Sequence, residues 1–122
     1  MEQIKSHRDL IVWQKAMELV VAVYKLSKNF PKEELYGLTS QLRRAAVSIP
    51  ANIAEGQGRR SKTEFNQFLG HARGSLLELD THLELALRLE YISTKEHAPV
   101  QEQLREVGRV MNGLMRSLTS NL

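Results

Sequence analysis

The sequence predicts an all-α protein: an antiparallel four-helix bundle of up-down-up-down topology, formed by a single domain that spans residues 1–122. Three observations support this fold class. Apolar residues recur at steps of three and four in four segments, which is the period of an amphipathic helix. No segment shows the period of two that is typical of a strand. Breaks of about two to six residues separate the segments, so consecutive helices are expected to lie as antiparallel neighbours.

The first helix is predicted from Leu10 to the break at Asn29-Phe30-Pro31, because the residue before a proline is disfavoured in a helix. Two adjacent apolar stripes run along this helix. One contains Leu10, Trp13, Met17, Val20 and Tyr24, and the other contains Val12, Ala16, Leu19, Val23 and Leu26. Together they form an apolar face wider than one neighbouring helix usually covers in a monomer.

The second helix is predicted from Pro31, which suits the first turn of a helix, to Gly56. The glycines of Gly56-Gln57-Gly58 are expected to end it. Pro50 lies in its interior and deletes the hydrogen bond to the carbonyl of Ala46. We expect a kink there, with Ser48 or Asn52 serving the freed backbone groups.

Two capping boxes, Ser61-Lys62-Thr63-Glu64 and Ser93-Thr94-Lys95-Glu96, are predicted to open the third and fourth helices. The core stripe of the third helix is Phe65, Leu69, Ala72, Leu76, Leu79, Leu83 and Ala86, and Tyr91-Ile92 closes the helix. The stripe of the fourth is Val100, Leu104, Val107, Met111, Leu114 and Leu118. Because Pro99 lies inside that helix, we expect either a kink or a true start near Ala98.

Additional leucines widen the apolar face of the third helix: Leu77, Leu85, Leu87 and Leu89. With the two stripes of the first helix, they leave more apolar width than one copy buries. This surplus predicts a self-associating bundle, because a symmetric ring or dimer would cover it.

Composition excludes several classes of function. The chain has no cysteine, which rules out disulfides, thiol catalysis, cysteine-ligated zinc and iron–sulfur clusters. It shows neither a secretory leader nor an apolar run long enough to span a membrane, so we expect a cytoplasmic protein with no membrane partner. The net charge is +3, and residues 35–60, with four arginines against one glutamate, carry a net +3 of their own. Such a patch attracts nucleic acid, although the acidic third helix offers simple charge compensation as the alternative.

A nucleotide site is disfavoured. Residues 56–63 are similar to a phosphate-binding loop, but Ser61 replaces its second glycine and a helix rather than a strand precedes it.

A di-metal site built from Glu-x-x-His pairs is also disfavoured, because no histidine has a glutamate three residues before it. Glu78 and His82, four apart on one face, are better interpreted as an ion pair. We therefore predict no enzyme activity, no catalytic residues, no metal, no cofactor and no small-molecule substrate.

Hairpin geometry about the turn near Arg60 predicts contacts between the second and third helices. It sets Arg44 opposite Glu78, as a structural polar pair. Because Glu78→Gln would break this pair, we predict that it lowers stability far more than Glu106→Gln does. The same geometry sets Ser48 against Gly74-Ser75, where small side chains let the helices approach closely.

Four basic residues are the candidates for contact with phosphate groups: Arg59, Arg60, Lys62 and Arg43. The first three lie at the turn and have no obvious acidic partner. The alternative for them is an exposed, solvated loop.

Several stretches resemble one family, the bacterial four-helix-bundle proteins described as 23S ribosomal RNA intervening-sequence proteins. They are residues 10–16, Phe30-Pro31 with Glu34 and residues 36–38, the run from Gln41 to Gly56, and Gly74-Ser75 with Glu78. The resemblance implies a ring, a homopentamer in particular, and assigns no catalytic residues. The family also looks related to accessory proteins of diversity-generating retroelements, which are basic pentamers that bind nucleic acid and reverse transcriptase.

These observations lead to a functional hypothesis. The protein is a non-enzymatic, ring-forming bundle that binds RNA or DNA through Arg59, Arg60, Lys62 and whichever of Arg43 and Arg44 is left unpaired. The alternative is an assembly or adaptor protein whose ring binds a protein partner and has no role with nucleic acid.

Overall fold

The computed structural model describes residues 4–120, and within them the chain is all-helical, with four α-helices and no strand. The α-helices are α1 (Ile11–Ser27), α2 (Leu38–Gln57), α3 (Lys62–Arg88) and α4 (Thr94–Thr119). Two short 3₁₀ helices, η1 (His7–Asp9) and η2 (Lys32–Glu34), precede α1 and α2. Within the same residues no helix is long and apolar enough to cross a membrane.

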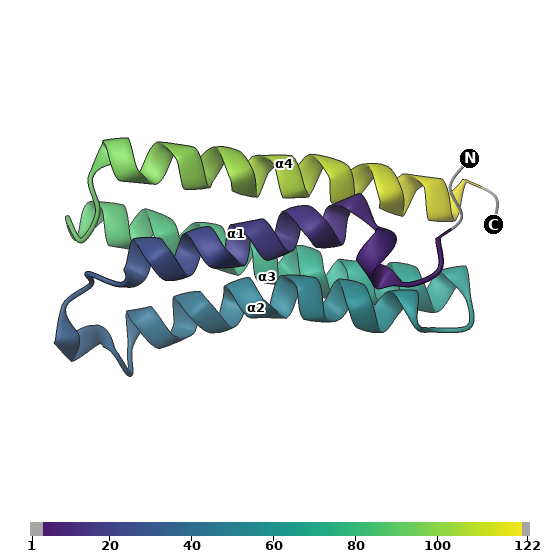
Figure 1. Ribbon diagram of the computed structural model, residues 1–122, viewed down its shortest axis with the longest axis horizontal. Coiled ribbons are helices and arrows are strands. Elements are labelled where there is room, and N and C mark those ends of the chain that lie inside the picture. Colours follow the sequence, from purple (N-terminus) through teal and green to yellow (C-terminus); the bar gives the residue numbers. More distant parts are fainter. Residues whose placement is uncertain (1–3, 121–122) are drawn as a thin grey trace.

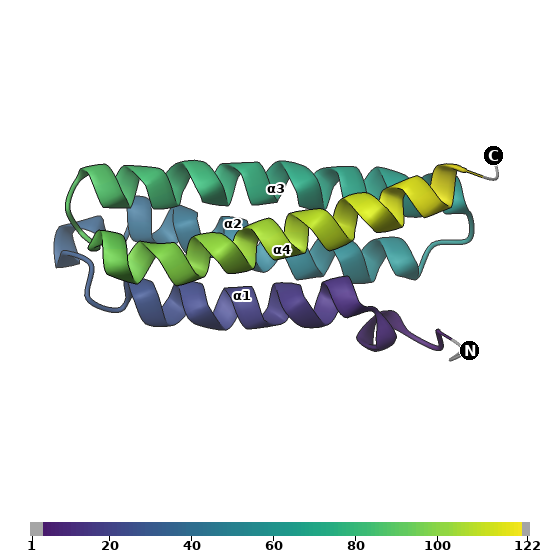
Figure 2. The same ribbon diagram turned by 90° about the horizontal axis from the view of Figure 1, so that it is seen from above.

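The four α-helices lie side by side along the long axis of the molecule (Figure 1). Helix α1 contacts α2 and α4, and α3 contacts the same two helices, so α1 and α3 occupy diagonal positions. The contact between α2 and α3 is the most extensive. The turn between α2 and α3, η1 and the end of α4 all lie at one end of the bundle (Figures 1 and 2).

The apolar stripes expected in α3 and α4 form the core. Six positions of the α3 stripe are buried: Leu69, Ala72, Leu76, Leu79, Leu83 and Ala86. In α4 the buried positions are Val100, Leu104, Val107 and Met111. Of the two stripes in α1, the structure buries Val12, Ala16, Leu19 and Val23. The predicted stripes of α3 and α4 are therefore confirmed as core faces, with Phe65, Leu114 and Leu118 partly buried, and of the two α1 stripes the one that begins at Val12 is the core face.

Apolar side chains beyond the core stay exposed on α1 and α3. On α1 they include two members of a predicted stripe, Met17 and Tyr24, and two residues outside both stripes, Ile11 and Val21. On α3 they include Leu77, 60% exposed, and Leu85. One copy of the chain thus leaves uncovered the surplus apolar width that the two helices show in sequence.

The predicted start of α2 at Pro31 is wrong. The chain forms η2 at Lys32–Glu34 and then turns, and α2 begins only at Leu38. Gly37 has φ -114° and ψ -116°, outside the helical region. The Glu34 carboxylate accepts a hydrogen bond from the Leu38 backbone N–H at 3.1 Å, which satisfies one of the free donors at the helix start. The proline therefore begins η2 and the turn that follows it, and not α2.

Of the two alternatives at Pro99, a true start near Ala98 is wrong, because α4 begins at Thr94, directly after the predicted capping residue Ser93, and continues through Pro99. Ser93 and Glu96 form the complete capping box there, each side chain bonding the other residue's backbone. At α3 the Ser61 hydroxyl accepts from the Glu64 N–H at 3.1 Å, as expected of a cap. The Glu64 carboxylate accepts from the Ser61 hydroxyl instead of returning to the backbone.

Candidate nucleic-acid interface

Three exposed basic side chains lie where α2 passes into α3: Arg59 and Arg60 in the turn and Lys62 at the first position of α3. Arg59 is engaged within the chain: its guanidinium lies 3.4 Å from the Glu55 carboxylate and 4.6 Å from the ring centre of Phe68. Across residues 4–120, the ion pairs include no partner for Arg60 or Lys62. Two of the three cations therefore stand free in solvent at this end of the bundle.

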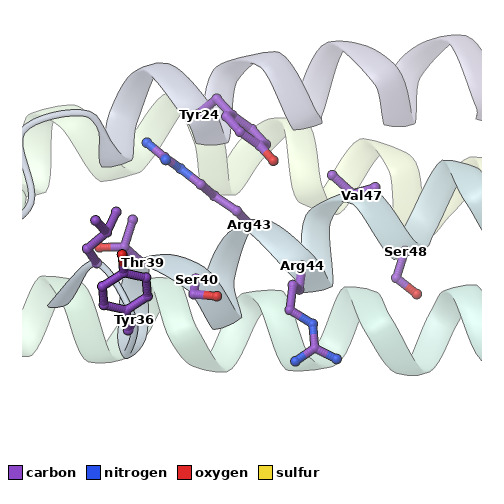
Figure 3. Close-up of a pocket in the computed structure, with 9 residues that line it drawn as sticks. Tyr24, Tyr36, Thr39, Ser40, Arg43, Arg44, Val47 and Ser48 are labelled. Atoms are coloured by element: carbon purple, nitrogen blue, oxygen red, sulfur yellow. The ribbon is translucent and has the colours of Figure 1, made fainter.

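Arg43 lies about 21 Å before the end of α2 at Gln57, at the 1.5 Å rise of a helix, and Arg59 lies beyond that end. Arg43 is half-buried, and its Nε donates a hydrogen bond to the Ser27 hydroxyl at 2.9 Å. Its guanidinium also lies 4.7 Å from the ring centre of Tyr24. Figure 3 shows Arg43 extending from α2 toward Tyr24. The structure thus separates Arg43 from the basic turn and uses it to join α2 to α1.

Arg44 and Glu78 do not form the ion pair expected from hairpin geometry. They line the same polar pocket between α2 and α3, with a volume of about 270 Å³. The Glu78 carboxylate lies instead 3.2 Å from Nε2 of His82, one turn along α3. The hairpin register places the two residues together, but the i,i+4 neighbour on the same helix competes for the carboxylate. Arg44 is exposed and extends away from Arg43 (Figure 3).

A small polar network joins the middle of α2 to α3. The hydroxyls of Ser48 and Ser75 lie 2.8 Å apart, which places Ser48 against the third helix at the expected register. The Asn52 amide donates to both the hydroxyl and the carbonyl of Ser48, each at 2.9 Å. We expected these side chains to serve the carbonyl of Ala46 freed by Pro50, but the observed acceptor is the carbonyl of Ser48. Helix α2 runs through Pro50 from Leu38 to Gln57.

Gly74 does not provide the expected close approach between helices. A Cβ placed on it would meet no atom within 4 Å, because this position faces open space. The close approach occurs at Gly56 instead, where a Cβ would lie 2.7 Å from Cβ of Phe68. Gly56 is buried at this contact.

The turn before α2 is fixed by a bond to the connection between α3 and α4. The Tyr91 hydroxyl donates to the Glu34 carboxylate at 2.8 Å. This bond, together with the one from the Leu38 N–H, lowers the pKa of Glu34. The same bond to Glu34 raises the pKa of Tyr91. The Glu34 carboxylate is therefore committed to these two partners.

The groove between α1 and α2 contains a pocket of about 660 Å³ that the sequence pattern did not predict (Figure 3). Its lining residues are Tyr24, Leu35, Tyr36, Thr39, Ser40, Arg43, Arg44, Val47 and Ser48. Tyr36 is 94% exposed. The one feature of the sequence that could have indicated this pocket is Tyr36, a few residues before Arg43-Arg44. These side chains surround one hollow only because the turn before Leu38 delays the start of α2.

Together these features define an all-α protein with four α-helices in residues 4–120, free basic side chains where α2 passes into α3, and two arginines along the α1–α2 groove. The chain belongs to the 23S rRNA-intervening sequence protein family, whose model matches residues 8–113. A similar solved structure is that of a protein of unknown function from the S23 ribosomal protein family of Bacteroides thetaiotaomicron. It has 26% sequence identity and a TM-score of 0.78, over 87% of this chain and 99% of that one. No curated protein matches.

Proposed function

We propose that this protein is a non-enzymatic, antiparallel up-down-up-down bundle that forms a homopentameric ring and binds RNA or DNA through its basic turn. The observation that carries the proposal is the pair of exposed cations, Arg60 and Lys62, without an acidic partner in residues 4–120. Lysine and arginine side chains free of internal partners are the groups that displace counterions from a phosphate backbone.

Further cations support this end of the bundle as the interface. The same end of the bundle also holds η1 and the last turn of α4 (Figure 1). Arg8 lies in η1, and Arg116 lies in the last turn of α4. Both arginines are exposed. A contact spread over three parts of the chain suits an extended polyanion better than a compact ligand.

Self-association would multiply this modest charge. The exposed apolar side chains of α1 and α3, among them Ile11, Val21 and Leu77, offer surface that a neighbouring copy can cover. In a ring of five copies, weak contacts to one strand act together and raise the overall affinity. If the family is related to the pentameric accessory proteins of retroelements, as the sequence motifs suggest, the same assembly is expected here.

The test is the salt dependence of binding to a fluorescent RNA, compared between the wild type and Arg60→Ala/Lys62→Ala. The wild-type affinity is expected to fall steeply with salt, and the variant to show a slope shallower by about 0.7 for each phosphate that is no longer neutralised. Arg105→Ala, an exposed arginine on α4 that pairs with Glu102, is the matched control. Unchanged slopes in the double variant would contradict the proposed interface.

A second function follows if neighbouring copies leave part of the apolar surface of α1 and α3 uncovered. In that case the assembly acts as an adaptor that binds a protein partner. Absence of binding to RNA and DNA at about 50 mM salt, where phosphate contacts are strong, would favour the adaptor over the nucleic-acid-binding ring.

A further inference from the structure

Tyr36 is an aromatic side chain displayed almost entirely in water. It is 94% exposed, and its neighbour Leu35 is 50% exposed, in the turn between η2 and α2. The Glu34 side chain holds this turn on both sides, through Leu38 of α2 and Tyr91 beyond α3. Tyr36 is therefore presented on a fixed turn, where its faces are open to a planar partner.

The surroundings of Tyr36 are cationic. A second hollow of about 350 Å³ adjoins the α1–α2 pocket and shares Leu35, Thr39 and Arg43 with it. The two linings together contain four basic residues, Lys28, Lys32, Arg43 and Arg44, and no aspartate or glutamate. Two further aromatic residues, Tyr24 and Phe30, line them as well.

The acidic residues of the same turn do not cancel this charge. Glu34 is bonded to Tyr91 and to the backbone of Leu38, and it lines neither hollow. Glu33 is exposed on η2 and lines neither hollow. Arg43 is held between Ser27 and Tyr24 and forms a shared wall of both hollows, while Lys28 and Lys32 remain at the surface.

We propose that these two hollows form a binding site for single-stranded nucleic acid, in which one base stacks on Tyr36 and the flanking phosphates contact Lys28, Lys32 and Arg44. Exposed aromatic rings interleaved with cations bind unpaired bases, because every base has a face that can stack. In a duplex those faces are covered by neighbouring bases, so this site selects single strands. The inference rests on the proposed function and adds a second contact, at the end of α2 remote from the basic turn.

The experiment measures fluorescence anisotropy of a labelled oligouridine of about 12 nucleotides, a length suited to a single-strand site. A labelled duplex of the same length is the comparison. Tyr36→Ala should weaken single-strand binding about five- to 150-fold, by a similar factor at every salt concentration, because stacking releases no counterions. Tyr36→Phe, which keeps the ring, should bind like the wild type. Lys28→Ala/Lys32→Ala should instead reduce the slope against salt.

The duplex comparison and the particle mass complete the test. Duplex affinity should be unchanged in Tyr36→Ala, and circular dichroism should show an intact fold, since the Tyr36 side chain is almost fully exposed. If Arg60→Ala/Lys62→Ala weakens binding while Tyr36→Ala does not, the inference fails and the proposed function stands. If Tyr36→Ala changes the particle mass and leaves single-strand affinity unaltered, Tyr36 belongs to a contact between copies and the inference is overturned. No binding of either probe would overturn both.

Discussion

The backbone of Gly56 lies so close to Phe68 that a Cβ on the glycine would come within 2.7 Å of Cβ of the aromatic residue. Real Cβ atoms do not approach to that distance, so only glycine allows α2 and α3 to pack as they do at this end. The expectation that Gly56-Gln57-Gly58 ends α2 is confirmed, because the helix ends at Gln57 with Gly58 as its C-cap. Gly56 in addition allows close packing, and within residues 4–120 no glycine has a positive φ.

We therefore expect Gly56→Ala to destabilise the protein by about 1–3 kcal/mol, the usual cost of overpacking a well-packed contact. Gly74→Ala is the matched control, because it lies inside α3 with open space at the Cβ position. That change should stabilise the protein by about 0.5–1 kcal/mol through helix propensity. Urea unfolding measures both. Changes of opposite sign in the free energy of unfolding of the two variants would support the close packing of α2 on α3. A Gly56→Ala variant more stable than the wild type would refute it.

The observed ion pairs reverse the expected order of two substitutions, Glu78→Gln and Glu106→Gln. Glu78, expected to pair with Arg44, contacts His82 and has an exposed side chain. Glu106 interacts with Arg109 and lies 3.8 Å from Lys15 of α1. The hydrogen bond from Arg109, and then the charges of Arg109 and Lys15, lower the pKa of Glu106. Glu106→Gln should therefore lower the melting temperature at least as much as Glu78→Gln. A much larger decrease for Glu78→Gln would restore the pair with Arg44.

The bond between Tyr91 and Glu34 gives stability a pH dependence with a defined sign. Because the folded state lowers the pKa of Glu34, its contribution is present at neutral pH and is lost as pH falls below about 4.3, through the folded pKa. The raised pKa of Tyr91 makes its contribution present below about pH 10 and lost as pH rises further.

Tyr91→Phe removes the bond between Tyr91 and Glu34. Stability should then change less with pH, both in the acid range and in the alkaline range. Melting temperatures between about pH 7 and about pH 3 measure the acid limb, with Tyr36→Phe as control because Tyr36 is exposed. An unchanged acid limb in Tyr91→Phe would show that Glu34 is held by Leu38 alone.

The core-facing residues could be predicted from sequence in the helices whose apolar residues recur without interruption at steps of three and four. The stripes of α3 and α4 could be predicted position by position, because spacing at three and four identifies one face regardless of the neighbours. The start of α2 could not. Pro31 and the acidic residues after it are typical of a helix start, yet the bond of Glu34 to Tyr91 links residues 57 apart and is invisible to a local pattern.

The candidate interface was less predictable for the same reason. The exposed turn with Arg60 and Lys62 follows directly from its position between two helices. Whether Arg43 is free depends on Ser27 and Tyr24 of α1, and thus on how α1 and α2 pack. The hollow beside Tyr36 arises from three separate segments, so only the folded chain displays it.

The central claim, an oligomer that binds nucleic acid, is tested most directly by light scattering after size exclusion, at about 50 mM salt, with and without single-stranded RNA. We expect a mass several times that of the 13.9 kDa chain, five times for the proposed pentamer, and a further increase when RNA is added. A particle with the mass of one chain that elutes separately from the RNA would contradict the account.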